Sequence, residues 1–255
     1  MDSSESESAV SRIDRVLSAL PIHAKATEFL VLPELWHLGA FNLAGVVEDS
    51  LAEEDAMFGE LASIAGAAGI WLHAGSFAIR DTSSASAGKA ANTAIVFGPS
   101  GHEVARYRKQ HLFGFEDGER TVIEASNDVT VIDTPLGQTA LTICYDLRFP
   151  EQYRALVDQG AETFLTCSGW PTSRIGHWDV LNQARAIENQ SFVVACNGRG
   201  THAGVTLGGN SMVVSPKGEV LARANIDDEF IDAEIAAAEV QQWRDAFPVL
   251  KDRIS

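Results

Sequence analysis

Long apolar runs and basic residues are both scarce in this chain of 255 residues. No run reaches the roughly 18 apolar residues of a transmembrane helix. The polar, acidic start of the chain lacks the basic and apolar regions of a secretory signal. Lys and Arg total 19 against 35 Asp and Glu, a net charge of −16. A surface of that sign repels phosphate backbones and anionic lipids, so the composition argues against nucleic-acid and membrane partners.

Cysteine is also rare, and its spacing argues against further classes of protein. Cys144, Cys167 and Cys196 form an odd set without a C-x-x-C pair. This pattern is not that of a disulfide framework, a zinc site or a thiol-redox motif. No G-x-G-x-x-G loop follows a first strand, and no G-x-x-x-x-G-K-[ST] loop is present, so a nucleotide-binding α/β protein is disfavoured. Free thiols suit a reducing compartment, and we expect a cytoplasmic protein.

The 45% of hydrophobic residues are arranged as short runs that alternate with helical patterns. Spacings of three and four residues predict helices, and compact apolar runs bounded by turn residues predict strands. Helices are predicted over residues 10–20, 51–69, 150–159 and 177–190. Strands are predicted over residues 29–32, 70–75, 92–97, 103–107, 129–133, 139–144, 163–167, 191–196, 212–214 and 219–221, with a strand-then-helix pattern from residue 231. We expect one α/β domain, residues 1–255, with a largely buried mixed sheet and helices outside.

Polar residues lie at the ends of several of these apolar runs, among them Glu34, His73, Cys144 and Asn197. The carboxyl ends of parallel strands meet at one edge of a sheet, where open α/β folds place their chemistry. Glu34 follows an apolar strand and Pro33. Partial dehydration there would raise the pKa of its carboxyl group and make it a usable general base. An ordinary surface carboxylate, or one in the first turn of a helix, explains the same position.

Position alone also does not decide whether Lys109 or any of the cysteines has a catalytic role. Lys109 lies in a basic run, and such runs are usually solvated faces. Each of Cys144, Cys167 and Cys196 ends an apolar strand, and a buried cysteine is most often a small packing residue. His177 precedes Trp178 at the start of a predicted helix and has no second metal ligand four residues on. Position alone therefore does not choose the nucleophile.

Three segments resemble the signature segments of the nitrilase superfamily of carbon–nitrogen hydrolases, in order and spacing. They are Leu-Pro-Glu-Leu-Trp (32–36), Tyr-Arg-Lys-Gln-His-Leu-Phe-Gly (107–114) and Ile-Cys-Tyr-Asp-Leu-Arg-Phe-Pro-Glu (143–151). The resemblance continues through Ser-Gly-Trp-Pro (168–171), Ala-Arg-Ala-Ile-Glu-Asn-Gln (184–190), Gly-Gly-Asn-Ser (208–211) and Phe-Pro-Val-Leu-Lys-Asp-Arg (247–253). It covers roughly residues 8–253. It implies a four-layer α-β-β-α sandwich of two mixed sheets, with no metal and no cofactor.

The resemblance assigns roles to individual residues. It makes Cys144 the nucleophile, Glu34 the general base and Lys109 the electrostatic stabiliser of the reaction. Glu119 matches the family's second, supporting glutamate, although Glu116 is close enough to compete for that assignment. The backbone N–H of Tyr145 is expected to bind the oxyanion beside Lys109. These roles describe an amide hydrolysed through a cysteine thioester, with release of ammonia and a carboxylic acid.

The sequence is most similar to the small amidase branch that contains the ω-amidases, which act on monoamides of 2-oxo dicarboxylates. A substrate with a free carboxylate needs a cation, and Arg148 and Arg174 are the candidates, although either side chain also suits a structural ion pair. Phe113 and Trp170 are candidates for the pocket wall or for simple packing. An N-carbamoyl amide hydrolase and a nitrilase are the alternatives within the fold.

Two further expectations concern the start of the chain and its assembly. Family members begin with a buried strand before the first helix, whereas Met1 to Ser4 occupy the place of the turn that ends that strand. We hypothesise about 8 further residues upstream. An empty strand position favours a second class of function, a catalytically impaired relative that only binds its ligand. The family usually pairs through helices, so we expect a homodimer or a higher homo-oligomer.

Overall fold

The computed structural model describes residues 2–3 (backbone only), 7–25, 27–80, 88–225, 228 and 230–254. Met1 and Ser4, on which the expectation of a missing first strand partly rests, lie outside the described residues. Within them, no helix is long and apolar enough to cross a membrane.

The first half of the chain forms a four-stranded sheet with the order β2-β3-β4-β5. Strands β2 and β3 are parallel, and the other neighbours are antiparallel. Asp55 caps the third helix by accepting from the backbone N–H of Met57, which explains why that helix begins later than residue 51. The elements are α1 (Ala9–Ala24), β2 (Phe29–Val31), α2 (Leu43–Glu48), α3 (Ala56–Ala68), β3 (Trp71–Arg80), β4 (Ala90–Phe97) and β5 (Glu103–Arg108).

The second half forms a six-stranded sheet with the order β13-β12-β9-β8-β7-β6. Its central strands β7, β8 and β9 are parallel, and hairpins complete both sides. The elements are the short helix η1 (Glu119–Thr121), β6 (Val131–Thr134), β7 (Gly137–Ile143), η2 (Cys144–Arg148), α4 (Pro150–Asp158), β8 (Thr163–Ser168), η3 (Thr172–Arg174), α5 (Ile175–Asn189), β9 (Phe192–Asn197), β12 (Met212–Val214), β13 (Val220–Arg223), α6 (Ala238–Ala246) and η4 (Val249–Asp252).

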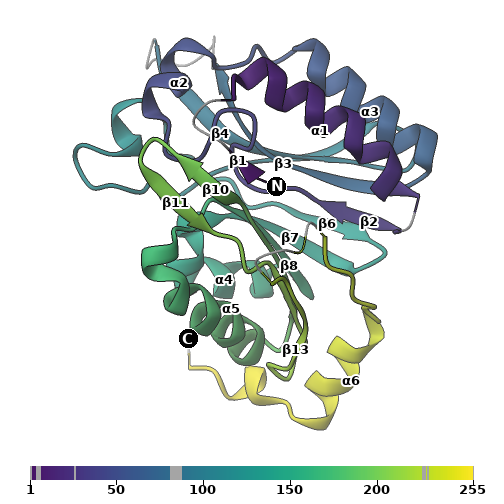
Figure 1. Ribbon diagram of the computed structural model, residues 1–255. Helices are drawn as coiled ribbons and strands as arrows, with labels where there is room; N and C mark the ends of the chain where they lie inside the picture. Colours follow the sequence, from purple (N-terminus) through teal and green to yellow (C-terminus); the bar gives the residue numbers. More distant parts are fainter. Residues whose placement is uncertain are drawn as a thin grey trace.

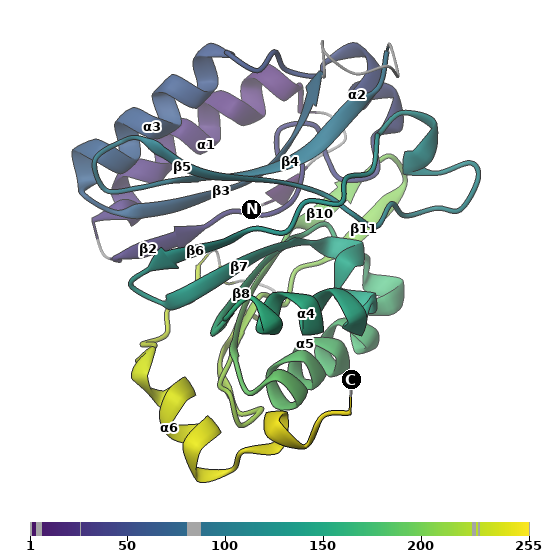
Figure 2. The same ribbon diagram turned by 180° about the vertical axis from the view of Figure 1, so that it is seen from behind.

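The two large sheets face each other, and helices cover their outer faces, as expected (Figures 1 and 2). One apolar cluster joins α1 and α3 to the four-stranded sheet, through residues such as Leu61 and Phe77. A second cluster contains Val96 from β4, Leu141 from β7 and Trp178 from α5, so it runs between the sheets and beneath the outer helices. The result is the predicted α-β-β-α order of layers, and the fold class is confirmed.

A small third sheet was not foreseen. Strands β10 (Arg199–His202) and β11 (Val205–Gly208) form a hairpin, and Asp2–Ser3 (β1) pairs with β10 in parallel. The two strands are four residues long, and only Val205 and Leu207 in them are large apolar residues, so no strand was predicted here. In the described part of the chain, β2 is the outermost strand at its end of the four-stranded sheet. The additional upstream strand stays a prediction.

The strand expected from residue 231 does not form. Residues 230–237 have no regular secondary structure before α6 begins at Ala238. The local pattern of Ile231, Ala233 and Ile235 alternates like a strand, but a strand also needs a neighbour that satisfies its backbone groups. No strand pairing includes these residues in the described structure, so the prediction was wrong at this position.

Candidate active site

Glu34 lies at a sharp turn just beyond β2. Leu35 has a φ of 43°, in the left-handed region that residues other than glycine seldom adopt. Neighbouring groups hold the turn, because Leu35 N donates to Ser76 Oγ at 3.2 Å and Trp36 Nε1 donates to the carbonyl of Ala74 at 2.8 Å. The turn thereby keeps the Glu34 carboxylate buried at the end of the strand.

Lys109 follows β5 and lies between two carboxylates. Its Nζ is 2.8 Å from Oε1 of Glu34 and 2.8 Å from Oε1 of Glu119. The side chains of Lys109, Glu34 and Glu119 are 0%, 2% and 7% exposed. Burial by itself would lower the pKa of Lys109, but Glu119 and Glu34 raise it well above its ordinary value. Lys109 is therefore a permanent ammonium group in a site closed to water.

Further donors hold the two carboxylates in place. Oε1 of Glu34 also accepts from Asn92 Nδ2 at 2.9 Å, and Oε2 accepts from the backbone N–H of Gly169 at 2.9 Å. Oε2 of Glu119 accepts from the backbone N–H of Phe113 at 2.7 Å. Burial raises the pKa of Glu119, and Glu34 adds to the rise while Lys109 opposes it. Glu116, the other candidate for the supporting position, is exposed.

Cys144 lies where β7 ends and η2 begins. Its φ of 46° places it in the left-handed region, and the residue is only 9% exposed. Burial raises the pKa of the Cys144 thiol, and the charge of Glu34 raises it further, whereas Lys109 lowers it. The resting group is consequently a neutral thiol. It can become a nucleophile only if a base removes its proton during the attack.

The two other cysteines lie side by side on neighbouring parallel strands. Cys167 on β8 is in register with Cys196 on β9, and both are free thiols. Burial raises the pKa of Cys196 to about 11 and that of Cys167 well above its ordinary value. Both residues lie within strands rather than at a turn, which is a packing environment.

Aromatic rings and two guanidinium groups gather around Tyr145, directly after the cysteine. The guanidinium carbon of Arg148 lies 4.7 Å from the ring centre of Trp170 and 6.0 Å from that of Tyr145. Arg174 lies 5.1 Å from the ring centre of Phe113, whose ring meets Tyr145 edge to face at 5.3 Å. Burial lowers the pKa of Arg148, and the charge of Arg174 contributes to the fall. All four side chains suggested for the pocket therefore belong to one group.

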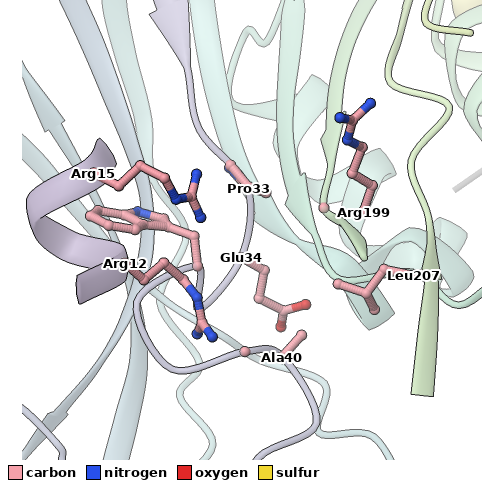
Figure 3. Close-up of a pocket in the computed structure, with 10 residues that line it drawn as sticks. Arg12, Arg15, Pro33, Glu34, Ala40, Arg199 and Leu207 are labelled. Atoms are coloured by element: carbon pink, nitrogen blue, oxygen red, sulfur yellow. The ribbon is translucent and has the colours of Figure 1, made fainter. Parts of the chain in front are cut away.

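Glu34 also borders a pocket on the side of α1 and the β10–β11 hairpin. Figure 3 shows Arg12 and Arg15 on one side of Glu34, and Arg199 and Leu207 on the other. The first two guanidinium groups form ion pairs with Glu7, 3.3 and 2.8 Å away. Neither Lys109 nor Cys144 lines this pocket. The arginines that line this pocket are therefore a different group from Arg148 and Arg174 near Tyr145.

Sequence reasoning missed two groups that touch Glu34. Asn92 was interpreted only as the start of a strand, and no motif marked it. Gly169 was noted in the Ser-Gly-Trp-Pro segment, but its backbone N–H was given no role. A Cβ at Gly169 would lie 2.0 Å from the Cβ of Ala40, so glycine is the residue that this close approach allows. Both contacts join segments that are far apart in the sequence.

The chain is similar to several known proteins. Residues 4–245 match the family model for carbon-nitrogen hydrolases. The chain is 40% identical over 251 residues to a 2-oxoglutaramate amidase of Paenarthrobacter nicotinovorans, covering 97% of this chain and 84% of that protein. It is 36% identical over 231 residues to a 2-oxoglutaramate amidase of Bacillus subtilis, covering 90% and 86%. The crystal structure of Saccharomyces cerevisiae Nit3, a nitrilase-superfamily member, superposes with a TM-score of 0.87 at 27% identity, covering 99% of this chain and 94% of that one.

The family model spans far more than half of the chain, and the first relative covers 97% of it at 40% identity. The resemblance inferred from the three signature segments is therefore confirmed. The protein belongs to the carbon–nitrogen hydrolase family, within the nitrilase superfamily.

Proposed function

We propose that the protein hydrolyses the terminal amide of a small 2-oxo dicarboxylate monoamide, as an ω-amidase does, through a thioester on Cys144. The observation that carries the proposal is the buried ammonium group of Lys109, held at 2.8 Å from both Glu34 and Glu119 and close enough to the strained Cys144 for their charges to interact. The relatives named 2-oxoglutaramate amidase support this choice of amide.

The first half of the reaction needs a base and a fixed positive charge. Glu34 takes the thiol proton as the sulfur of Cys144 attacks the amide carbon, because burial keeps the resting thiol neutral. The developing oxyanion meets the ammonium group of Lys109 and the backbone N–H of Tyr145. One donor to an oxyanion typically contributes about 10²–10³ in rate. Lys109 keeps its proton throughout, so it supplies charge without taking part in proton transfer.

The second half returns the enzyme to its starting state. When the carbon–nitrogen bond breaks, Glu34 gives its proton to the leaving nitrogen, which departs as ammonia and leaves an acyl thioester. Glu34 then takes a proton from water, whose oxygen attacks the thioester carbon. The carboxylic acid leaves, and the proton held by Glu34 returns to the sulfur of Cys144.

The guanidinium groups of Arg148 and Arg174 suit the far end of a substrate with a carboxylate. Both lie against aromatic rings that also contact Tyr145, the residue after the nucleophile. Arg148 donates from Nη2 to His177 Nδ1 at 3.2 Å, which leaves its other guanidinium N–H groups to bind a ligand. In this arrangement Phe113 and Trp170 hold the planes of the two guanidinium groups and form the pocket wall.

A substrate panel tests the proposal. It contains 2-oxoglutaramate, 2-oxosuccinamate, glutamine, an N-carbamoyl amine, a simple nitrile and propionamide, with ammonia release as the readout. We expect 2-oxoglutaramate or 2-oxosuccinamate to be preferred, and C144A to lose at least about 10³-fold in kcat. Turnover of the nitrile or of the N-carbamoyl compound alone would assign another reaction of the fold. Binding of the 2-oxo amides without turnover would indicate a relative that only binds its ligand.

The arginines have their own test. Substitution of Arg174 by Met should raise KM for 2-oxoglutaramate but leave KM for propionamide, which lacks the carboxylate, unchanged. The exposed Arg253, paired with Asp158 at 2.6 Å, provides the control R253M. An equal rise in KM for both substrates would assign Arg174 a structural role. R148M is tested in the same way.

The proposal includes a cytoplasmic homodimer. Val180 and Ile187, one heptad apart on the same face of α5, are 66% and 54% exposed. A second copy packed on this face would cover them. Light scattering after gel filtration should give twice the mass of the chain, and V180E should shift the protein toward the monomer. The three free thiols suit the reducing cytoplasm.

A further inference from the structure

Asp146 is a fully buried carboxylate two residues after Cys144, and both of its oxygens are in use. Oδ2 accepts from the backbone N–H of Ile143 at 2.9 Å and from the hydroxyl of Tyr107 at 2.6 Å. Oδ1 accepts from the backbone N–H of His111 at 3.0 Å, and its ring Nδ1 lies 2.9 Å away. One carboxylate therefore joins the turn of the nucleophile to a second stretch of chain.

That second stretch is the one that carries Lys109. Tyr107 precedes Lys109 by two residues and His111 follows it by two, so Asp146 contacts the chain on both sides of the ammonium-bearing residue. Tyr107 is itself fixed by Gln152, whose Nε2 donates to the tyrosine hydroxyl at 2.8 Å. Burial raises the pKa of Tyr107 well above its ordinary value, and Asp146 adds to the rise, so the hydroxyl stays a donor.

The turn needs such support because it is strained. Cys144 has a φ of 46°, and conformations of this kind persist only where the surroundings hold them. Asp146 holds the beginning of the turn through Ile143. Buried Arg185 holds its end, because Nη2 and Nε donate to the carbonyl of Leu147 at 2.7 and 3.1 Å. The two contacts act on opposite sides of Cys144.

We propose that Asp146 is a positioning residue that sets the distance between the sulfur of Cys144 and the ammonium group of Lys109, through Tyr107 and His111. The proposal rests on the amidase function only for the kinetic part of its test. Lys109 stabilises charge on the sulfur and on the oxyanion, and both effects fall steeply if the two segments slip apart. Asp146 touches neither the sulfur nor the ammonium group in any hydrogen bond of the described structure.

A matched pair of tyrosine variants tests this role. Tyr107→Phe removes the hydroxyl that binds Asp146 and keeps the ring. Tyr153→Phe removes the hydroxyl of another fully buried tyrosine, which bonds Thr142 at 3.1 Å and Thr166 at 3.5 Å and forms no hydrogen bond with Asp146 in the described structure. We expect Y107F to lower kcat for the preferred amide about 10- to 100-fold with KM within about threefold. Y153F should change stability alone.

The second readout needs no substrate. Iodoacetamide alkylates Cys144 at a rate that follows its thiolate, and peptide mapping separates this reaction from those of Cys167 and Cys196. Each variant is measured at a temperature the same number of degrees below its own Tm. Under these conditions Y107F should slow alkylation of Cys144 about 10-fold or more relative to Y153F. If the wild-type protein hydrolyses no amide, the amidase proposal fails, and the alkylation rates still decide the role of Asp146.

A second variant covers the case in which Y107F does not fold. His111→Phe keeps the stacked contact with Phe149, whose ring centre is 3.7 Å away, and keeps the backbone N–H, but removes Nδ1. His111 is partly exposed, so the change is tolerable. We expect alkylation of Cys144 to slow in H111F as well. Alkylation and kcat within twofold of Y153F in the folded variants would overturn the proposal.

Discussion

Asn92 and Glu34 form a direct side-chain contact in the centre of the site. Nδ2 of Asn92 donates to Oε1 of Glu34 at 2.9 Å, and the same oxygen accepts from Lys109 at 2.8 Å. Asn92 is fully buried on β4, whereas Glu34 follows β2. The amide therefore orients the carboxylate that, in the proposed reaction, takes the thiol proton and gives it to the leaving nitrogen.

We expect Asn92→Ala to lower kcat about 10- to 100-fold, because a hydrogen bond to a charged group contributes about 1.5–3 kcal/mol and here fixes the orientation of the base. KM should change little, since Asn92 has no contact with the proposed arginine pocket. Steady-state kinetics with the preferred amide measure both constants. A kcat within twofold of wild type would assign Asn92 to packing alone.

The backbone of Gly169 offers a test by compensation. A Cβ at this position would lie 2.0 Å from the Cβ of Ala40, and the next atom of Ala40 is 3.6 Å away. Gly169→Ala should displace the Gly169 N–H from Oε2 of Glu34 and lower kcat at least about 10-fold. The double change A40G/G169A removes the clash and should recover most of the loss. If the double variant is as slow as G169A, the clash is not the cause.

Loss of Lys109 should affect stability as well as activity. Lys109→Met leaves Glu34 and Glu119 buried without their cation, and breaking a buried ion pair in this way costs about 3–5 kcal/mol. Urea unfolding measures the change, with exposed Lys25→Ala as the control. Adding E119Q to K109M removes one of the two stranded carboxylates and should restore part of the stability. If the double variant recovers none of the lost stability, this account is contradicted.

The buried histidines predict a loss of stability in acid. Burial lowers the pKa of His37 to about 3 and that of His73 to about 4. Neither ring nitrogen of His37 has a hydrogen-bond partner among the described residues. Above pH 6.5 both histidines are neutral in the folded and the unfolded chain. Below pH 6.5 these histidines take up protons in the unfolded chain but stay neutral in the folded chain. Stability therefore falls with pH until the pH reaches the pKa of the folded state.

At pH 5 each histidine should cost about 2 kcal/mol relative to neutral pH. Two variants isolate this contribution from that of the carboxylates. His73→Asn keeps an acceptor for the Gly75 N–H, which now donates to His73 Nδ1 at 3.2 Å, and His37→Leu removes an orphaned ring. Each should lose less stability than wild type between pH 7 and pH 5 in urea unfolding. Parallel losses in variant and wild type would show that the ring does not titrate.

Much of the fold was predictable because its signals are local. The segments that became β2, β7, β8 and β9 are compact and mostly apolar and are bounded by turn residues, as is typical of buried parallel strands. The hairpin of β10 and β11 lacked such a run, so no strand was predicted there. The segment from residue 231 shows the opposite failure, since its local alternation found no neighbouring strand.

The sequence by itself determined the family and the order of the signature segments, and it carries the prediction that Cys144, rather than two other cysteines at strand ends, is the nucleophile. Residue types and their spacing carry that information. Only the tertiary structure decided that Glu119 rather than Glu116 meets Lys109, that Asn92 and Gly169 hold Glu34, and that Asp146 joins the segments of Cys144 and Lys109. These are contacts between distant segments, and they exist because two sheets pack face to face and bring separate strand ends to one buried place.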